Sequence, residues 1–211
     1  MIIKVFDEFA EEYDKWYQQN REVFESECRL IKSLELKGFG IEVGVGTGIF
    51  APFSNISIGI DPAINMLKIA KRRGVEVINA VGEAMPFRND VFDFVIMITT
   101  LPFLKDPSKV LDEIRRILKN GGEIAIVDVP KNSKWGRLYE EKKAKGHRFY
   151  RFANFYNFEE ILEILNRKGF EVIKIRATLR QPPESITKVE DPEDEFKNHG
   201  FIGIKALNNK V

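Results

Sequence analysis

The stretch that decides the fold is Ile41–Gly48, which reads IEVGVGTG, together with Ile58–Asp61, which reads IGID. The first is an apolar strand that runs into glycines at alternate positions, and the second is a strand that ends on an acid. Glycine lets the backbone turn sharply and approach a ligand closely, and a carboxylate at the tip of the next strand can accept both hydroxyls of a ribose. We therefore predict a site for a nucleoside cofactor. Its candidate residues are Gly44, Gly46, Gly48 and Asp61.

The spacing of these glycines separates two classes of cofactor. The chain has Gly-x-Gly-x-Gly, whereas dinucleotide-binding folds carry Gly-x-Gly-x-x-Gly. A nicotinamide-dependent oxidoreductase also needs a second nucleotide-binding half, and the sequence shows none. Such an enzyme is the less favoured alternative. A protein that binds its cofactor without catalysis is another alternative, because the loop at 50–55 after the glycines is short.

Composition bounds the class of protein. The chain has 211 residues, 44% of them hydrophobic, which is enough for one domain with a full apolar core. Lys and Arg number 33 against 32 Asp and Glu, so the net charge is +1 and no nucleic-acid partner is expected. No apolar run approaches the roughly 20 residues of a membrane span. The residues after Met1 are too acidic for a signal peptide, so we expect a cytoplasmic protein with no membrane partner.

Metal chemistry is not expected either. Cys28 is the only cysteine, which excludes an internal disulfide and a metal site built from cysteines. No group of His, Asp and Glu has the spacing of metal ligands.

Strand-like and helix-like segments alternate along most of the chain. The strands are short, apolar and rich in branched residues, as buried parallel strands are. They cover Phe39–Val43, Ile56–Ile60, Val75–Ile78, Phe92–Thr99 and Glu123–Val129. Between them, one helix starts at Asp61-Pro62, and another covers Val110–Lys119 and stops at Asn120-Gly121-Gly122.

The C-terminal part departs from this rhythm. A helix over Phe158–Lys168 precedes a strand over Phe170–Leu179, a polar loop over Gln181–Asn198 and a last strand over Phe201–Leu207. Two strands joined without a helix are more easily antiparallel than parallel neighbours. The whole pattern predicts a Rossmann-like, doubly wound α/β fold. Its sheet should be seven-stranded and mostly parallel, with helices on both faces and an antiparallel C-terminal strand.

Six segments also occur in the order of a known family. They are Phe6–Trp16, Glu42–Gly48, Gly59–Ala63, Glu83–Phe87, Phe92–Val95 and Glu113–Gly122. This set resembles the class I S-adenosylmethionine-dependent methyltransferases, and most of all the small-molecule type that includes the ubiquinone and menaquinone biosynthesis enzymes. The resemblance is strong from about Phe6 to Val129. It implies S-adenosylmethionine as the cofactor and methyl transfer to a small-molecule acceptor.

The resemblance also assigns roles to residues around the glycines. In the family, the acid at the position of Glu42 holds the amino group of the cofactor, and the acid at Asp61 holds the ribose. Ala63 and Ile64 would then lie near the adenine, and Pro62 is a further candidate for cofactor binding. The family has an aspartate where this chain has Val81.

The remaining cofactor contacts come from other segments. The backbone amides of Gly82 and Glu83 are the candidates that replace the missing aspartate. Thr99 follows the fourth strand, where the cofactor's sulfonium and the acceptor meet in the family. Tyr13 matches a tyrosine that reaches the cofactor, and Arg21 is a candidate for neutralising the cofactor's carboxylate.

The acceptor itself stays open, including whether it is methylated at O, N, S or C. The chain lacks the Asn/Asp-Pro-Pro-Tyr box of enzymes that methylate amino groups of nucleic acids, which argues against DNA adenine. His147 is the candidate general base, needed only if the acceptor is protonated at neutral pH. We expect one domain over 1–211. Its parts are a leading helical segment (1–37), a cofactor-binding core (38–130), a substrate or lid insertion (131–157) and a C-terminal helix with strands (158–211).

Overall fold

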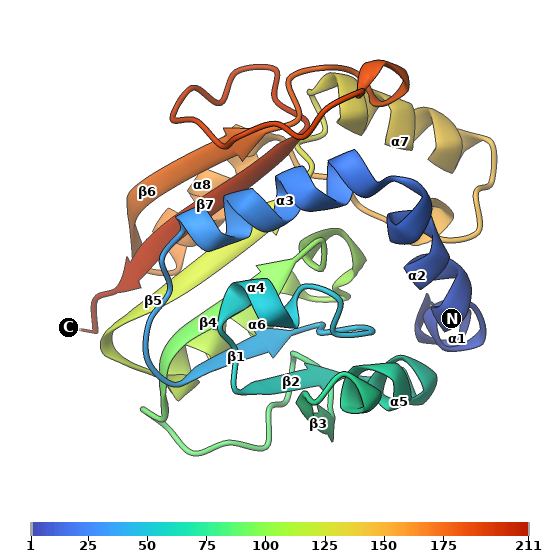
Figure 1. The fold of residues 1–211 in the computed structure, drawn as a ribbon. Coiled ribbons are helices and arrows are strands. Elements are labelled where there is room, and N and C mark those ends of the chain that lie inside the picture. The colour runs from blue at the N-terminus through green and yellow to red at the C-terminus, as the bar shows by residue number, and fades with distance from the viewer. Residues whose placement is uncertain (1, 211) are drawn as a thin grey trace.

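The computed structural model describes residues 2–210; residues 1 and 211, the two ends of the predicted domain, lie outside the described residues. Seven strands form one sheet in the order β3-β2-β1-β4-β5-β7-β6 (Figure 1). Their bounds are β1 Gly40–Val43, β2 Ile58–Asp61, β3 Glu76–Asn79, β4 Phe92–Ile98, β5 Leu118–Asp128, β6 Phe170–Thr178 and β7 Phe201–Asn208. Strands β1 to β5 are parallel, and β7 runs antiparallel between β5 and β6. The predicted Rossmann-like sheet with its antiparallel C-terminal strand is confirmed.

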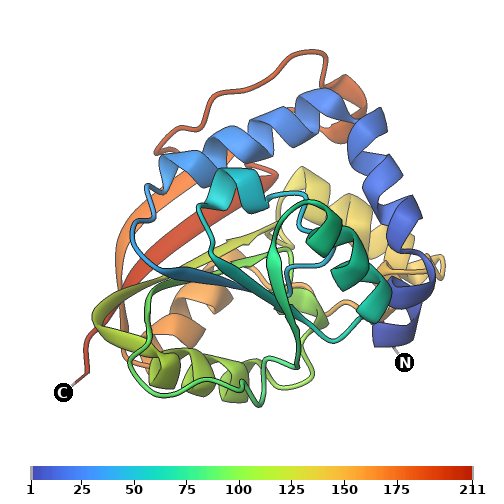
Figure 2. The same cartoon turned by 60° about the horizontal axis from the view of Figure 1, so that its bottom comes forward.

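Helices cover both faces of this sheet (Figures 1 and 2). The α-helices are α1 Ile2–Glu8, α2 Ala10–Gln19, α3 Arg21–Ser33, α4 Ala51–Ser54, α5 Ile64–Arg72, α6 Pro107–Ile117, α7 Lys134–Ala144 and α8 Phe158–Arg167. Short 3-10 helices are η1 Leu101–Phe103, η2 Tyr150–Phe152 and η3 Pro183–Ser185. Helices α3 and α7 pack on one face of β4 and β5, and α6 and α8 pack on the other.

The alternation of side chains along β4 separates the two cores. Phe94 and Ile96 pack with α3 and α7, whereas Val95 and Met97 pack with α6 and α8. Successive residues of a strand point to opposite faces, so a continuous apolar run is what a strand covered on both sides requires. The order of the strands reverses between β1 and β4. In folds of this kind, ligands bind beyond the carboxyl ends of the strands at such a point.

The largest difference between the predicted and the observed elements lies where α6 meets β5. The expected helix over Val110–Lys119 ends at Ile117, and Leu118 already belongs to β5, where it pairs with Phe92. The pairing with β4 shifts register before Glu123, and Gly121 in this irregular part has a φ of 72°. The glycines therefore serve a bulge inside a strand rather than the end of a helix. Pairing with β4 is a long-range contact that no local pattern reveals.

The leading segment is also more broken than its resemblance implied. The expected helix over Phe6–Trp16 is divided between α1 and α2 at Phe9. Asp7 in α1 accepts a hydrogen bond from the backbone N of Asn65 at 2.6 Å, and Asp14 in α2 forms an ion pair with Arg73. These contacts anchor both helices to the region of α5. Among residues 2–210, no helix combines the length and the apolar character that crossing a membrane requires.

Candidate functional site

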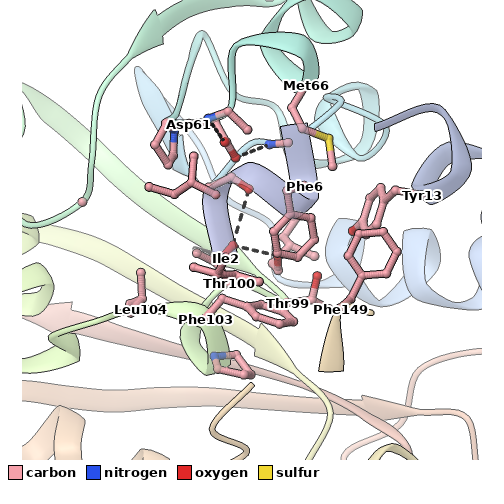
Figure 3. A pocket seen from close by; sticks show the side chains of 18 of the residues that line it. Ile2, Phe6, Tyr13, Asp61, Met66, Thr99, Thr100, Phe103, Leu104 and Phe149 are labelled. Atoms are coloured by element: carbon pink, nitrogen blue, oxygen red, sulfur yellow. Dashed lines mark hydrogen bonds between the residues drawn. The ribbon is translucent and has the colours of Figure 1, made fainter. Parts of the chain in front are cut away.

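A cavity of about 980 Å³ lies beyond the carboxyl ends of β1, β2, β4 and β5. Its walls come from these strand ends, from the β3–β4 connection, and from α1, α2, α7 and η2. Figure 3 shows Asp61 on one side of it, with the rings of Phe6, Tyr13 and Phe149 gathered on the other. A cavity of this size, mostly apolar with a few polar groups, is typical of a site for a cofactor and a small ligand.

The glycine turn forms one wall of the cavity. Gly44 and Gly46 line it, with φ values of 77° and 52°. A Cβ on Gly44 would lie 2.5 Å from the side chain of Thr100, so no larger residue fits there. A Cβ on Gly46 would meet only the sulfur of Met66, at 4.0 Å, which leaves open space for a ligand to approach the backbone.

Gly48 has a different surrounding. It does not line the cavity, although its φ is 69°. A Cβ there would lie 3.1 Å from the side chains of Ala70 and Val75. Gly48 therefore allows the turn to pack closely against the end of α5.

Asp61 is held in place by two backbone amides. Its Oδ2 accepts a hydrogen bond from the N of Gly46 at 3.0 Å, and its Oδ1 accepts one from the N of Ala63 at 2.8 Å. Burial raises the pKa of Asp61 to about 6, and the two amide hydrogen bonds oppose that rise. Asp61, Pro62 and Ala63 all line the cavity, whereas Ile64 does not and is exposed. The carboxylate is thus fixed toward a ligand while keeping acceptor capacity.

Glu42 lies behind this wall. It precedes the glycine turn in β1, is 2% exposed, and its Oε2 has no hydrogen-bond partner among residues 2–210. Burial raises its pKa well above the usual range, and the charge of Asp61 adds to the rise. It does not itself line the cavity. An unpaired buried acid just before the glycine turn fits a ligand that carries an amino group, because burial of a lone charge is costly.

The connection between β3 and β4 contributes the next wall. Val81, Gly82 and Glu83 line the cavity. The Oε1 of Glu83 accepts a hydrogen bond from the N of Asp106 at 3.3 Å. Its carboxylate thus already contacts the cap of α6, which leaves the backbone of Gly82 and Glu83 as the more available contact.

Thr99 and Tyr13 also line the cavity. Thr99 has a φ of 49° and donates its backbone N to the carbonyl of Val127 at 2.8 Å, which ends β4 at the cavity. The hydroxyls of Tyr13 and Tyr17 lie 3.3 Å apart, and burial raises the pKa of Tyr13 to about 12.

Arg21 is not brought to the site. It lies at the start of α3, its side chain is 80% exposed, and its Nε donates to Glu25 at 3.0 Å. It does not line the cavity. The structure therefore gives no support to a contact between Arg21 and the cofactor.

His147 does line the cavity. Its ring stacks on Tyr150 with centroids 4.6 Å apart, and its Nδ1 has no hydrogen-bond partner among the described residues. Burial lowers its pKa, and the nearby charges of Lys142 and Arg148 add to the effect. The imidazole is therefore neutral at pH 7 and able to accept a proton.

Two buried acids in the cavity wall were missed in the sequence. Glu27 in α3 is 5% exposed, and Asp128 at the end of β5 is also buried. The sequence does contain an indication that Glu27 is buried, because its spacing places it on the same apolar face of α3 as Val23 and Leu30. Asp128 follows a fully apolar run, and burial raises its pKa to about 7. Within residues 2–210, no group of three or more His, Cys, Asp or Glu side chains is arranged to hold a metal.

Comparisons with known proteins agree with this geometry. Residues 41–126 match the model of a methyltransferase domain family. An uncharacterized protein of Methanocaldococcus jannaschii is 43% identical over 204 residues, covering 97% of this chain and 98% of its own. A demethylmenaquinone methyltransferase of Renibacterium salmoninarum is 26% identical over 140 residues, covering 60% of this chain and 58% of its own.

One solved structure matches this chain over nearly the full length of both proteins. A crystal structure of an S-adenosylmethionine-dependent methyltransferase from Thermotoga maritima, described as a possible histamine N-methyltransferase, has a TM-score of 0.94 and 35% identity. It covers 99% of this chain and 100% of the other. These likenesses imply S-adenosylmethionine as the cofactor, and the open glycine turn beside Glu42 and Asp61 fits it. The chain belongs to the class I S-adenosylmethionine-dependent methyltransferases.

Proposed function

We propose that this protein transfers a methyl group from S-adenosylmethionine to a small organic acceptor that binds in the same cavity. The observation that carries this proposal is the continuity of the cavity, which joins the Gly44–Gly46 turn and Asp61 to a second, aromatic part lined from α2, α7 and η2. A volume of about 980 Å³ has room for a cofactor and a small molecule together. Histamine, the acceptor suggested for the Thermotoga maritima protein, is a small molecule of this kind.

The residues on the glycine side would hold the cofactor. Glu42 would receive its amino group, the backbone of Gly46 would lie along it, and Asp61 would accept the ribose hydroxyls. The adenine would lie against Pro62 and Ala63, with the backbone of Gly82 and Glu83 at its edge. The support is that Asp61 is already oriented by two amides and that Glu42 has an unpaired oxygen.

When bound, S-adenosylmethionine supplies a methyl carbon activated by the positive sulfur. The protein's own part is to hold the acceptor in line at near-contact distance and to exclude water. Phe6 and Phe149, which both line the cavity, stack with centroids 5.1 Å apart and bring α1 against the segment after α7. This pair supports a role of the leading helices in closing the site over its ligands.

His147 is the residue we propose for proton removal. Its neutral imidazole faces the cavity with an unpartnered Nδ1. It would accept a proton only from an acceptor that is protonated at neutral pH. A His147→Gln variant would then lose turnover while keeping its affinity for the cofactor.

The experiment that tests the proposal is calorimetric titration of the protein with S-adenosylmethionine, S-adenosylhomocysteine and NAD. We expect micromolar binding of the first two and none of NAD, with binding weakened by Asp61→Ala. The matched control is Asp112→Ala, an exposed acid on α6 that pairs with Lys168 outside the cavity. Turnover with any acceptor distinguishes an enzyme from a non-catalytic binding protein. Absence of binding to the wild-type protein would contradict the proposal.

A further inference from the structure

Glu27 is a buried acid that the proposed cofactor site leaves unused. It lines the cavity from α3, is 5% exposed, and its Oε2 has no hydrogen-bond partner among residues 2–210. Burial raises its pKa well above the usual range, and no cation of the described chain offsets that rise. A buried polar atom without a partner calls for an explanation, and a ligand that supplies one is the most direct.

Aromatic rings surround this carboxylate. We name as the aromatic cage the five rings that line the cavity beside it. They are Tyr13, Tyr17, Tyr139, Tyr150 and Phe155. Tyr139 and Tyr150 stack with centroids 4.5 Å apart, and Tyr13 meets Tyr17 edge-on at 5.4 Å. Val23 and Leu30, about one turn before and after Glu27 on the same face of α3, pack in one cluster with Tyr17, Tyr139 and Phe155, so this face of α3 turns Glu27 toward the rings.

Tyr139 and Tyr150 of the cage lie at the other end of the cavity from the ribose-binding acid. Asp61 ends β2, whereas α7 and η2, which carry Tyr139 and Tyr150, follow β5 in the chain. Three strand spacings separate β2 from β5 in the sheet, or roughly 14 Å at the usual distance between strands. The amino group of the cofactor already has an unpaired acid near the glycines, namely Glu42. Glu27 is therefore available to the acceptor.

We propose that Glu27 and the aromatic cage bind the ammonium group of the methyl acceptor, so that the acceptor is a small organic amine. This rests on the proposed function. A buried carboxylate gives the cation a charge-assisted hydrogen bond, and the faces of tyrosine rings attract it further. Lys142 lines the same cavity with its Nζ 5.6 Å from the Tyr139 ring centroid, so one face of this ring already contacts a cation.

The change in protonation of Glu27 makes amine binding measurable as a release of protons. Burial raises the pKa of the Glu27 carboxyl and so favours its protonated form, whereas an ammonium beside it favours the ionised form. An amine that enters from solution as its ammonium ion therefore forms an ion pair with Glu27 as the carboxyl gives up its proton to the buffer. Up to about one proton is released for each amine bound. Neutral ligands release none.

The test uses the protein loaded with S-adenosylhomocysteine and two matched pairs of probes. The pairs are benzylamine with benzyl alcohol and tyramine with tyrosol, and benzoate serves as the anionic comparison. Calorimetry in buffers of different ionisation enthalpy measures affinity and proton release together. We expect each amine to bind at least about tenfold more tightly than its alcohol, with benzoate weakest, because only the cation pairs with Glu27.

Three variants locate the effect. Glu27→Gln has the same shape and should lose the amine preference and the proton release while keeping its affinity for S-adenosylhomocysteine. Glu25→Gln, on an exposed position of the same helix, should behave as wild type. Tyr150→Leu should weaken amine binding by about threefold to tenfold, through the lost ring face.

Each result of these measurements either supports or overturns the proposal. Equal binding of amines and alcohols by the wild-type protein overturns the proposal, and so does an amine preference that survives in Glu27→Gln. A loss of affinity for S-adenosylhomocysteine in Glu27→Gln assigns the acid to the cofactor and also overturns it. If the wild-type protein does not bind S-adenosylhomocysteine at all, the proposed function itself fails. The two failures are thereby distinguished.

Discussion

The Oδ2 of Asp61 accepts a hydrogen bond from the backbone N of Gly46 at 3.0 Å, which joins the acid at the end of β2 to the glycine turn after β1. The same carboxylate accepts from the N of Ala63 through Oδ1. One side chain thus sets the shape of the turn and the start of the following helix. We propose that this arrangement holds the Asp61 carboxylate in the orientation that binds the ribose before the cofactor arrives. Less conformational freedom is then lost on binding.

The pH dependence of cofactor affinity follows from Asp61. Burial raises its pKa to about 6, and only the ionised carboxylate accepts hydrogen bonds from both ribose hydroxyls. As pH falls below about 6, affinity for S-adenosylhomocysteine should fall by up to about tenfold per pH unit. Calorimetric titration between pH 4.5 and 8, values chosen to span about two units around the pKa, measures this. Asp61→Asn should bind more weakly and show a flatter profile, and an unchanged slope would refute the assignment.

Asp128 should make the protein less stable at high pH. Its pKa is raised to about 7 by burial, against about 3.8 in the unfolded chain, so the native state binds the proton more tightly. The unfolding free energy contributed by this group therefore falls as pH rises from about 4 to about 7, and stays low above that. Asp128→Asn keeps the acceptor for the N of Val129 and should be more stable than wild type at pH 8 by about 2 to 4 kcal/mol.

Urea unfolding measured at pH 5 and at pH 8 tests this difference. These values lie roughly two units below and one unit above the pKa of Asp128 in the folded protein. The Asn variant should gain over wild type mainly at the higher pH. An equal gain at both values would mean that the charge of Asp128 is not the cause.

Gly44→Ala should damage both stability and cofactor binding. The added Cβ would lie 2.5 Å from the side chain of Thr100, and the alanine would have to adopt a φ of 77°. We expect a loss of roughly 1 to 3 kcal/mol in unfolding free energy and a weaker binding of S-adenosylmethionine, because the turn or Thr100 must move.

Gly74→Ala is the matched control for Gly44→Ala. Gly74 has a φ of 84°, but a Cβ there meets nothing within 4 Å. It should cost about 1 kcal/mol through backbone strain alone and leave cofactor binding intact. Equal binding defects in both variants would show that the strain, and not the contact with Thr100, is responsible.

The ion pair between Asp14 and Arg73 should hold the leading helices in place. Arg73 also donates to the carbonyl of Thr47 at 2.7 Å, so it links α2, the end of α5 and the glycine turn. Asp14 is buried and the Arg73 side chain is 30% exposed, and Asp14→Asn should cost about 1 to 3 kcal/mol because Arg73 loses a charged partner. Hydrogen exchange of the α1 and α2 amides should then become faster.

The exposed ion pair between Glu12 and Arg148 is the control for the ion pair between Asp14 and Arg73. Both side chains are about half exposed, so Glu12→Gln should cost less than about 1 kcal/mol. If Asp14→Asn and Glu12→Gln change the exchange of α1 and α2 equally, the proposed anchoring by Arg73 is wrong.

The α/β class, the parallel core of the sheet and the glycine turn with its acid could all be predicted from local patterns of residues. These features depend on local patterns: apolar runs that only doubly covered strands tolerate, and glycines at positions where φ is positive. The positions of Gly44, Gly46 and Asp61 at the cavity follow from the same patterns, because the carboxyl ends of adjacent parallel strands meet at one edge.

Which side chains reach the cavity could not be predicted in the same way, because it depends on long-range packing. Leu118 became a strand residue through its pairing with Phe92, far away in the chain. Arg21 points to solvent although it is next to segments that line the site, whereas Glu27, one and a half turns further along α3, is buried in the wall. A helix of 3.6 residues per turn rotates by about 100° per residue, so Arg21 and Glu27 point to different faces, and only packing against the sheet and α7 selects the face that is buried.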